Sequence, residues 1–138
     1  MIDSKFLYAG KASFVIRNPK NESVTVKYSK AKAKVNYRTG QPWPETFFMS
    51  LRHGNGAWVY VGRMARTART VSRATLLPAT LDRPIKVAEW AIKVLNGEAT
   101  LPAGYTIEHT GRCGVCYKLL RDPVSIALGI GPVCQDKY

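Results

Sequence analysis

The sequence predicts an α+β protein: a small antiparallel β-sheet packed by one α-helix and followed by a C-terminal cysteine-containing knuckle. Alternating apolar and polar residues around short turns predict hairpins in the N-terminal half. One amphipathic stretch, at about residues 82–96, predicts the helix. Three cysteines and a histidine after residue 108 predict the knuckle. We therefore expect a β-rich module with one helix over residues 1–104 and a knuckle domain over residues 105–138, with one shared core or two.

Composition and charge narrow the class of protein. Of the 138 residues, 46% are hydrophobic, which excludes the composition of a disordered chain. Lys and Arg total 21 against 9 Asp and Glu, and this excess favours a polyanionic partner over a merely solubilising surface. Because no apolar run approaches 18 residues and the N-terminus lacks a secretory signal, we expect a cytoplasmic protein without a membrane partner.

The first hairpin is predicted from KASFVIR and SVTVKYS, residues 11–17 and 23–29, which flank the turn NPKNE. The alternation runs on through KAKAKV and places Lys30, Lys32 and Lys34 on one face if the strand continues. Two interpretations stay open. The lysines form a ladder that meets phosphates, or they protect an edge strand from pairing with another chain.

A loop and a second hairpin follow. RTGQPWPE, residues 38–45, contains one glycine and two prolines and must be a loop. FFMSLRH and WVYVGRM flank GNGA, whose glycines supply the positive φ of a short hairpin turn.

RMARTARTVSR, residues 63–73, is the densest arginine cluster. Arg63, Arg66, Arg69 and Arg73 would form one stripe on a helix and would scatter over both faces of a strand. The threonines, the valine and the serine weaken the helical interpretation, so a flexible basic loop that orders on a partner is the alternative. A stretch that only faces solvent is the third.

The predicted helix lies in LDRPIKVAEWAIKVLNGEA. Asp82 is expected to cap it, Pro84 to sit in its first turn and Asn96-Gly97 to end it. Trp90 is expected to pack against the sheet, as aromatics in amphipathic helices usually do. LPAGYTIEHT then predicts a turn into a short strand that delivers His109.

The last segment carries the metal chemistry. Cys113 and Cys116 form a C-x2-C turn, Cys134 supplies a third sulfur and His109 is the best fourth ligand, which together predict a treble-clef-like Cys3His knuckle with one structural Zn²⁺. Asp122-Pro123 marks a turn and Ser125 is expected to cap a short helix on the way back to Cys134. The alternative, a redox C-x2-C, lacks a βαβ context.

GRCGVCYKLLRDPVSIALGIGPVC resembles the C-terminal zinc-knuckle domain of unknown function of many phage and actinobacterial proteins. Loosely, the resemblance extends back to residue 46. It implies a zinc-binding accessory protein of phage type, acting in a bacterial host cell, with His109, Cys113, Cys116 and Cys134 as the zinc ligands. It brings no established activity, and it leaves the basic stretches unexplained.

The first functional hypothesis is a non-enzymatic protein that binds DNA or RNA through phosphate contacts, with Tyr28, Tyr37 and Trp43 stacking on unpaired bases. The alternative is an inhibitor whose basic surface binds a host protein, such as a defence nuclease or RNA polymerase. Neither needs a small-molecule substrate. The residues expected to contact the partner are Lys30, Lys32, Lys34, Arg38, Arg63, Arg66, Arg69, Arg73, Arg112, Lys118 and Arg121.

Catalysis is the least favoured hypothesis. A Cys113–His109 nucleophile pair and a zinc nuclease are both conceivable, but the cysteines serve better as ligands. The few carboxylates show no catalytic spacing. We therefore expect no enzymatic activity.

Overall fold

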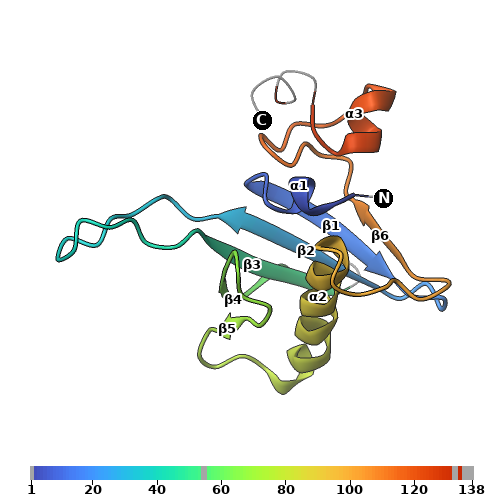
Figure 1. The fold of residues 1–138 in the computed structure, drawn as a ribbon. Helices are drawn as coiled ribbons and strands as arrows, with labels where there is room; N and C mark the ends of the chain where they lie inside the picture. Colours follow the sequence, from blue (N-terminus) through green and yellow to red (C-terminus); the bar gives the residue numbers. More distant parts are fainter. Residues whose placement is uncertain (1, 54–55, 132–133, 135–138) are drawn as a thin grey trace.

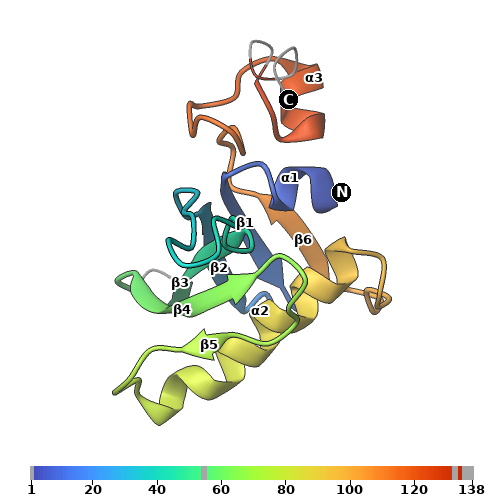
Figure 2. The same cartoon turned by 60° about the vertical axis from the view of Figure 1, so that its left-hand side comes forward.

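A six-stranded antiparallel sheet organises the chain, in the order β5-β4-β3-β2-β1-β6. The computed structural model describes residues 2–53, 56–131 and 134. One long helix, α2, lies across one face of this sheet, and the C-terminal segment with α3 sits beyond one end of it (Figures 1 and 2). Within the described residues, no helix combines the length and the apolar character needed to cross a bilayer.

Two hairpins form the centre of the sheet, and both were predicted. β1 (Lys11–Arg17) pairs with β2 (Ser23–Lys30), and β3 (Thr46–His53) pairs with β4 (Val59–Ala65). The predicted GNGA turn falls partly on residues 54–55, outside the described part.

Each edge of the sheet carries a short strand. β5 (Ser72–Arg73) pairs with β4, and β6 (Thr106–His109) pairs with β1. The sheet therefore continues past residue 104, because β6 comes from the segment assigned to the knuckle.

Four helices complete the described fold. These are α1 (Ser4–Leu7), the 3-10 helix η1 (Ala79–Leu81), α2 (Asp82–Leu95) and α3 (Pro123–Leu128). α2 has the predicted length, but Asp82 does not cap it. η1 runs directly into α2, so the N-cap is Leu81. The Asp82 carboxylate instead pairs with Arg73 at 2.8 Å and Lys86 at 3.3 Å.

The core lies between α2 and the sheet. Ile85, Ala88 and Ile92 of α2 are fully buried, as are Phe14 and Val26 of the central strands. Other buried rings fill the end of the sheet nearest α1: Tyr28 and Phe47 stack with their centroids 4.8 Å apart, and Tyr8 packs against both. Trp90 is partly buried against the core and meets Tyr105 edge to face, which confirms that it serves packing.

Residues 31–45 form an arm that projects from the sheet, at the left of Figure 1. β2 ends at Lys30, and the two sides of the arm are joined by backbone hydrogen bonds and by a bridge between Val35 and Pro42. The lysine ladder on a continuing strand is therefore wrong. Val35 is 50% exposed, since no second layer covers the arm and its alternating pattern has no core to face.

A β-bulge shifts the register of β4 against β3. Met49 pairs with Gly62 but Ser50 pairs with Tyr60, so β4 has one extra residue, Val61, at this point. Val61 is buried. Tyr60 and Arg63 are both exposed, although residues three apart on a regular strand point to opposite faces.

The buried tyrosine Tyr28 offers a test of this core. Its hydroxyl has no hydrogen-bond partner within the described chain, and burial raises its pKa. Replacing it by phenylalanine removes an unsatisfied polar group, so Tyr28→Phe should raise the free energy of unfolding by about 1 kcal/mol.

Tyr8→Phe is the matched control. The Tyr8 hydroxyl donates to the Arg66 carbonyl at 3.3 Å and accepts from Asn96 Nδ2 at 2.9 Å, so its loss should lower stability by about 1 kcal/mol. Urea denaturation of both variants measures the difference, and equal destabilisation by the two substitutions would contradict this account of the core.

Candidate metal centre and basic surface

Three cysteines converge at the C-terminal end of the described chain. The sulfur atoms of Cys113, Cys116 and Cys134 all lie within 4.8 Å of one another. A backbone turn presents the first two: the Tyr117 N–H donates to the Cys113 carbonyl at 2.9 Å, and the Cys113 N–H donates to the Lys118 carbonyl at 2.8 Å. The tight turn lets two sulfurs of C-x2-C face one point.

Backbone amides point at the buried sulfur of this cluster. Cys113 Sγ accepts from Gly131 N–H at 3.2 Å and from Val115 N–H at 3.4 Å. Burial acts to raise the pKa of Cys113, but the amides of Gly131, Cys116 and Val115 outweigh it and lower the pKa to about 7. Burial and the neighbouring thiols raise the pKa of Cys134 to about 11.

α3 brings the chain back to Cys134. Asp122, and not Ser125, caps this helix: the Asp122 carboxylate accepts from the Ser125 N–H at 3.1 Å, and Ser125 itself is buried in the first turn. Gly129 ends the helix with φ of 74°, in the left-handed region. This reversal places Gly131 against the Cys113 sulfur.

The structure does not bring His109, the predicted fourth ligand, into the sulfur cluster. Its Nδ1 accepts from the Gly111 N–H at 2.9 Å, and its Nε2 hydrogen-bonds the Ile126 carbonyl. Both ring nitrogens are thus occupied. The cause is the pairing of β6 with β1, which sets His109 opposite Phe14 and directs its ring towards Phe6.

The donor set fits a metal ion that prefers sulfur. Three converging sulfurs, one of them held by amide donors, match the thiolate ligands of soft and borderline cations. Within the described part of the chain, no fourth side chain joins them. The cysteines line a hollow of about 420 Å³, which Lys118, Arg121 and Asp122 also border.

The C-terminal segment that holds the cysteines, residues 110–131 and 134, packs against the N-terminal helix and is called the knuckle below. Phe6 is fully buried, and a Cβ added to Gly114 or Gly129 would come within 2.8 and 2.6 Å of its ring. The Lys11 N–H also donates to the Gly114 carbonyl at 2.7 Å. These contacts pack the knuckle against α1 and the start of β1.

Most of the predicted arginine cluster forms ion pairs at the protein surface. The segment is not a helix: Arg63 lies in β4, Arg73 in β5, and the residues between them form turns. Three of the four arginines form ion pairs with acidic residues far away in the sequence: Arg66 with Glu45, Arg69 with Glu98 and Arg73 with Asp82. Lys30 shares Glu45.

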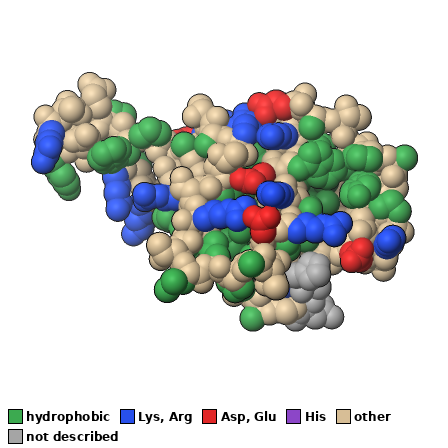
Figure 3. All heavy atoms as spheres, turned by 90° about the horizontal axis from the view of Figure 1, so that it is seen from below, with side chains coloured by type: hydrophobic (Ala, Val, Ile, Leu, Met, Phe, Trp, Pro, Cys, Tyr) green, Lys and Arg blue, Asp and Glu red, His purple; other side chains and the backbone are tan. Residues whose placement is uncertain are grey.

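Figure 3 shows acidic side chains next to basic ones over the body of the molecule. The ion pairs lower the pKa of each acid, chiefly through hydrogen bonds from the paired cations. Because Glu45 pairs with both Lys30 and Arg66, and Asp82 with both Arg73 and Lys86, the acids offset only part of this positive charge.

The face of the sheet opposite α2, called the open face below, holds five cations, of which only Arg63 was expected from the sequence to contact a partner. Along each strand, residues next to a buried one point to this face, away from α2. The cations at such positions are Lys11, Arg17, Lys27, Arg52 and Arg63. No ion pair joins any of them to an acid within the described residues. The period-two spacing of the strands could have placed these cations on one face. The prediction instead rested on dense basic runs, and only Arg63 lies in one.

The other predicted cations lie in two places. Lys32, Lys34 and Arg38 are exposed on the arm, together with the aromatic residues Tyr37 and Trp43. Arg112 lies over the Tyr117 ring at 5.1 Å, while Lys118 and Arg121 border the cysteine hollow. Tyr28 was expected to stack on bases, which is wrong because its ring is fully buried against Phe47.

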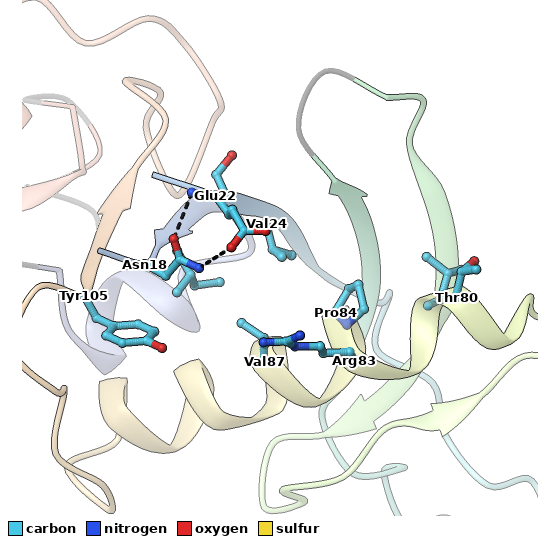
Figure 4. Close-up of a pocket in the computed structure, with 11 residues that line it drawn as sticks. Asn18, Glu22, Val24, Thr80, Arg83, Pro84, Val87 and Tyr105 are labelled. Atoms are coloured by element: carbon cyan, nitrogen blue, oxygen red, sulfur yellow. Dashed lines mark hydrogen bonds between the residues drawn. The ribbon is translucent and has the colours of Figure 1, made fainter. Parts of the chain in front are cut away.

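A further hollow of about 380 Å³ opens beside the start of α2 (Figure 4). Asn18 and Glu22, joined by a hydrogen bond of 2.9 Å, lie on one side of it and Arg83 on the other. Val24, Val87 and other apolar residues make its floor. The hollow is remote from the cysteines, which lie beyond the other end of the sheet.

The thiol pKa values predict how the metal-free protein titrates. As the pH rises through about 7, Cys113 should lose its proton before any unperturbed thiol does, whereas Cys134 should stay protonated to about pH 11. Thiolate absorbance near 240 nm follows both steps. Cys113→Ser should remove the step near pH 7 and Cys134→Ser should keep it; a first step near the ordinary thiol pKa in the wild-type protein would contradict the role of the amides.

The Phe6 contact predicts a steric difference between two glycines that share a left-handed backbone. Gly129→Ala should cost about 3 kcal/mol, from backbone strain plus the clash with Phe6. Gly97→Ala, with φ of 76° and open space around it, should cost only about 1 kcal/mol. Chemical denaturation compares them, and equal costs would mean that the knuckle does not pack on Phe6.

Comparison with known proteins bears on the C-terminal segment alone. No curated protein and no solved structure matches the chain. Residues 106–138, which include β6, the three cysteines and α3, match a family of unknown function, DUF6011. The expected resemblance to a domain of unknown function is thereby confirmed for this segment, which is similar to that family.

Proposed function

We propose that this protein is a small, non-enzymatic nucleic-acid-binding protein whose C-terminal knuckle holds one structural Zn²⁺. Its open sheet face would contact the phosphates, and the arm would extend the contact surface. This assignment keeps the polymer class expected from the charge but moves the main contact away from the arginine cluster at residues 63–73.

The observation that carries the proposal is the charge on the open sheet face. Five cations face the same way, and none is paired with an acid within the described residues. Unpaired cations repel one another, so a surface that gathers them costs stability unless an anion binds there. A phosphate backbone supplies evenly spaced anions and gains counterion entropy on binding.

The arm supports the same function. Lys32, Lys34 and Arg38 lie on it, and Tyr37 and Trp43 are 101% and 56% exposed. Exposed rings beside cations are typical of surfaces that hold unpaired bases and the adjoining backbone. An arm used only for packing would bury these rings.

Zinc is proposed from the chemistry of the three sulfurs. Zn²⁺ accepts thiolates at about 2.3 Å, which places two bound sulfurs about 3.8 Å apart in a tetrahedral site. The cysteine sulfurs need only a small closure to reach this spacing. The bound ion would tie the end of the chain to the C-x2-C turn, which gives it a structural role. The best-placed carboxylates already serve ion pairs, and this favours a protein without catalysis.

The test is binding of the zinc-loaded protein to labelled DNA and RNA across a salt series, with zinc determined in the same sample. We expect one zinc per chain and an affinity that falls steeply with salt. The triple variant Lys11→Gln, Arg17→Gln and Arg63→Gln should weaken binding to every sequence and reduce the salt slope by about 2 to 3.

A variant of equal charge on the other side of the sheet is the control. Arg83→Gln, Lys86→Gln and Lys93→Gln lie on the exposed side of α2 and should leave the salt slope nearly unchanged. Equal losses in the two triple variants would show that net charge alone drives binding. No binding at physiological salt by the zinc-loaded protein would overturn the proposed function.

A further inference from the structure

The open face of the sheet carries aromatic rings as well as cations. Arg63, Phe48, Ser29 and Lys11 are Cα partners in succession across β4, β3, β2 and β1. Because directly paired residues share a face, these four side chains form one row across the sheet. The row contains an exposed ring with a cation on the adjacent strand.

A second row lies beside the first. Tyr60, Ser50, Lys27 and Ser13 pair in the same succession. Tyr60 and Phe48 meet edge to face, with centroids 6.1 Å apart, and are 47% and 41% exposed. In both rows a serine, Ser29 or Ser50, stands between the ring and the lysine.

The β-bulge is what brings this pair of rows together. With Val61 as the extra residue, Tyr60 and Arg63 both leave the core side of β4. Gly62 permits the bend, at φ of 150° and so close to β5 that a Cβ would lie 2.2 Å from the Ser72 carbonyl oxygen. Bulges commonly re-aim side chains at functional surfaces.

Two cations of the open face, Lys27 and Arg52, lie against one ring, that of Trp58. Lys27 Nζ lies 4.3 Å from the centroid of Trp58, and the Arg52 guanidinium lies 4.9 Å from the same ring. The ring fixes the position of both cations but, unlike an acidic partner, leaves their positive charge in place. Arg52 Nε is buried and has no hydrogen-bond partner within the described residues.

Where the rows approach the knuckle, the surface deepens. A hollow of about 310 Å³ is bordered by Lys11, Lys27, Lys30 and Tyr117. Tyr117 belongs to the C-x2-C turn and adopts φ of 67°, a conformation that costs a non-glycine residue free energy. Its ring faces Lys27 from 5.9 Å. The hollow joins the sheet face to the knuckle and offers a site for a phosphate.

We propose that the open face binds single-stranded nucleic acid, with two bases stacked on Phe48 and Tyr60 and the backbone following Lys11, Lys27 and Arg63 towards the hollow beneath Tyr117. This inference rests on the proposed function and specifies its substrate. Unpaired bases expose the flat faces that such rings bind, whereas a duplex stacks those faces internally. The face also lacks, within the described chain, a helix that would enter a groove.

The experiment measures binding of the zinc-loaded full chain to a labelled mixed-sequence DNA 20-mer, single-stranded and as a duplex, and to the corresponding RNA strand. The variant Phe48→Leu with Tyr60→Leu removes both rings but keeps apolar side chains at exposed positions. The variant Phe48→Tyr with Tyr60→Phe exchanges the two rings and is the matched control. Thermal unfolding checks that each variant keeps its fold.

We expect the wild-type protein to prefer the single strands over the duplex. The leucine pair should lose roughly tenfold or more in single-strand affinity and little in duplex affinity, because stacking contributes only to unpaired bases. The exchanged pair should stay within about twofold of the wild type, since each position keeps a ring that stacks.

Three results overturn the inference, and they are distinguishable. Equal binding of single strands and duplex, with no loss in the leucine pair, would overturn single-strand stacking and leave phosphate binding intact. Absence of binding to all three polymers would overturn the proposed function as well. A loss shared by the leucine pair and the exchanged pair would also contradict stacking.

Discussion

The contact between Phe6 and two glycines unites the parts of this protein. Phe6 comes from a helix of one turn, whose Asp3 cap accepts hydrogen bonds from the Lys5 and Phe6 amides. Its ring fills the space that Gly114 and Gly129 leave between sheet and knuckle. Without this ring, the cysteine turn would be held mainly by β6 and one backbone hydrogen bond from Lys11. The sulfur cluster thus has its position because an N-terminal side chain supports it.

The two faces of the sheet have different roles: one forms the core and the other carries cations. The α2 side buries the rings and aliphatic side chains that stabilise the fold, and most acid–base pairs form around that side and its edges. On the open side, where Glu108 of β6 also lies, no ion pair joins the cations to an acid within the described residues, and the Trp58 ring holds two of the cations. The basic residues therefore fall into two groups. One group forms ion pairs that stabilise the protein, and the other is available to bind an anion.

Local patterns predicted local structure well. Both central hairpins, α2 and β6 follow from period-two or helical spacing, because these signals need only near neighbours. The positions of the other predicted site residues depend on contacts with residues distant in the sequence. Arg66, Arg69 and Arg73 were predicted as a binding cluster, but each forms an ion pair with an acid 9 to 29 residues away. His109 has ligand spacing in sequence, yet strand pairing turns its ring towards Phe6.

The bulge at Val61 has a consequence for how this protein can vary. A substitution on the open face changes one side chain, but regular pairing of all the present β4 residues, without the bulge, would reverse which side chains face α2 on one side of Val61. Either Tyr60 or Arg63 would then enter the core. Related chains that present both of these side chains on the open face should therefore have either the bulge or a β4 that is one residue shorter at this point.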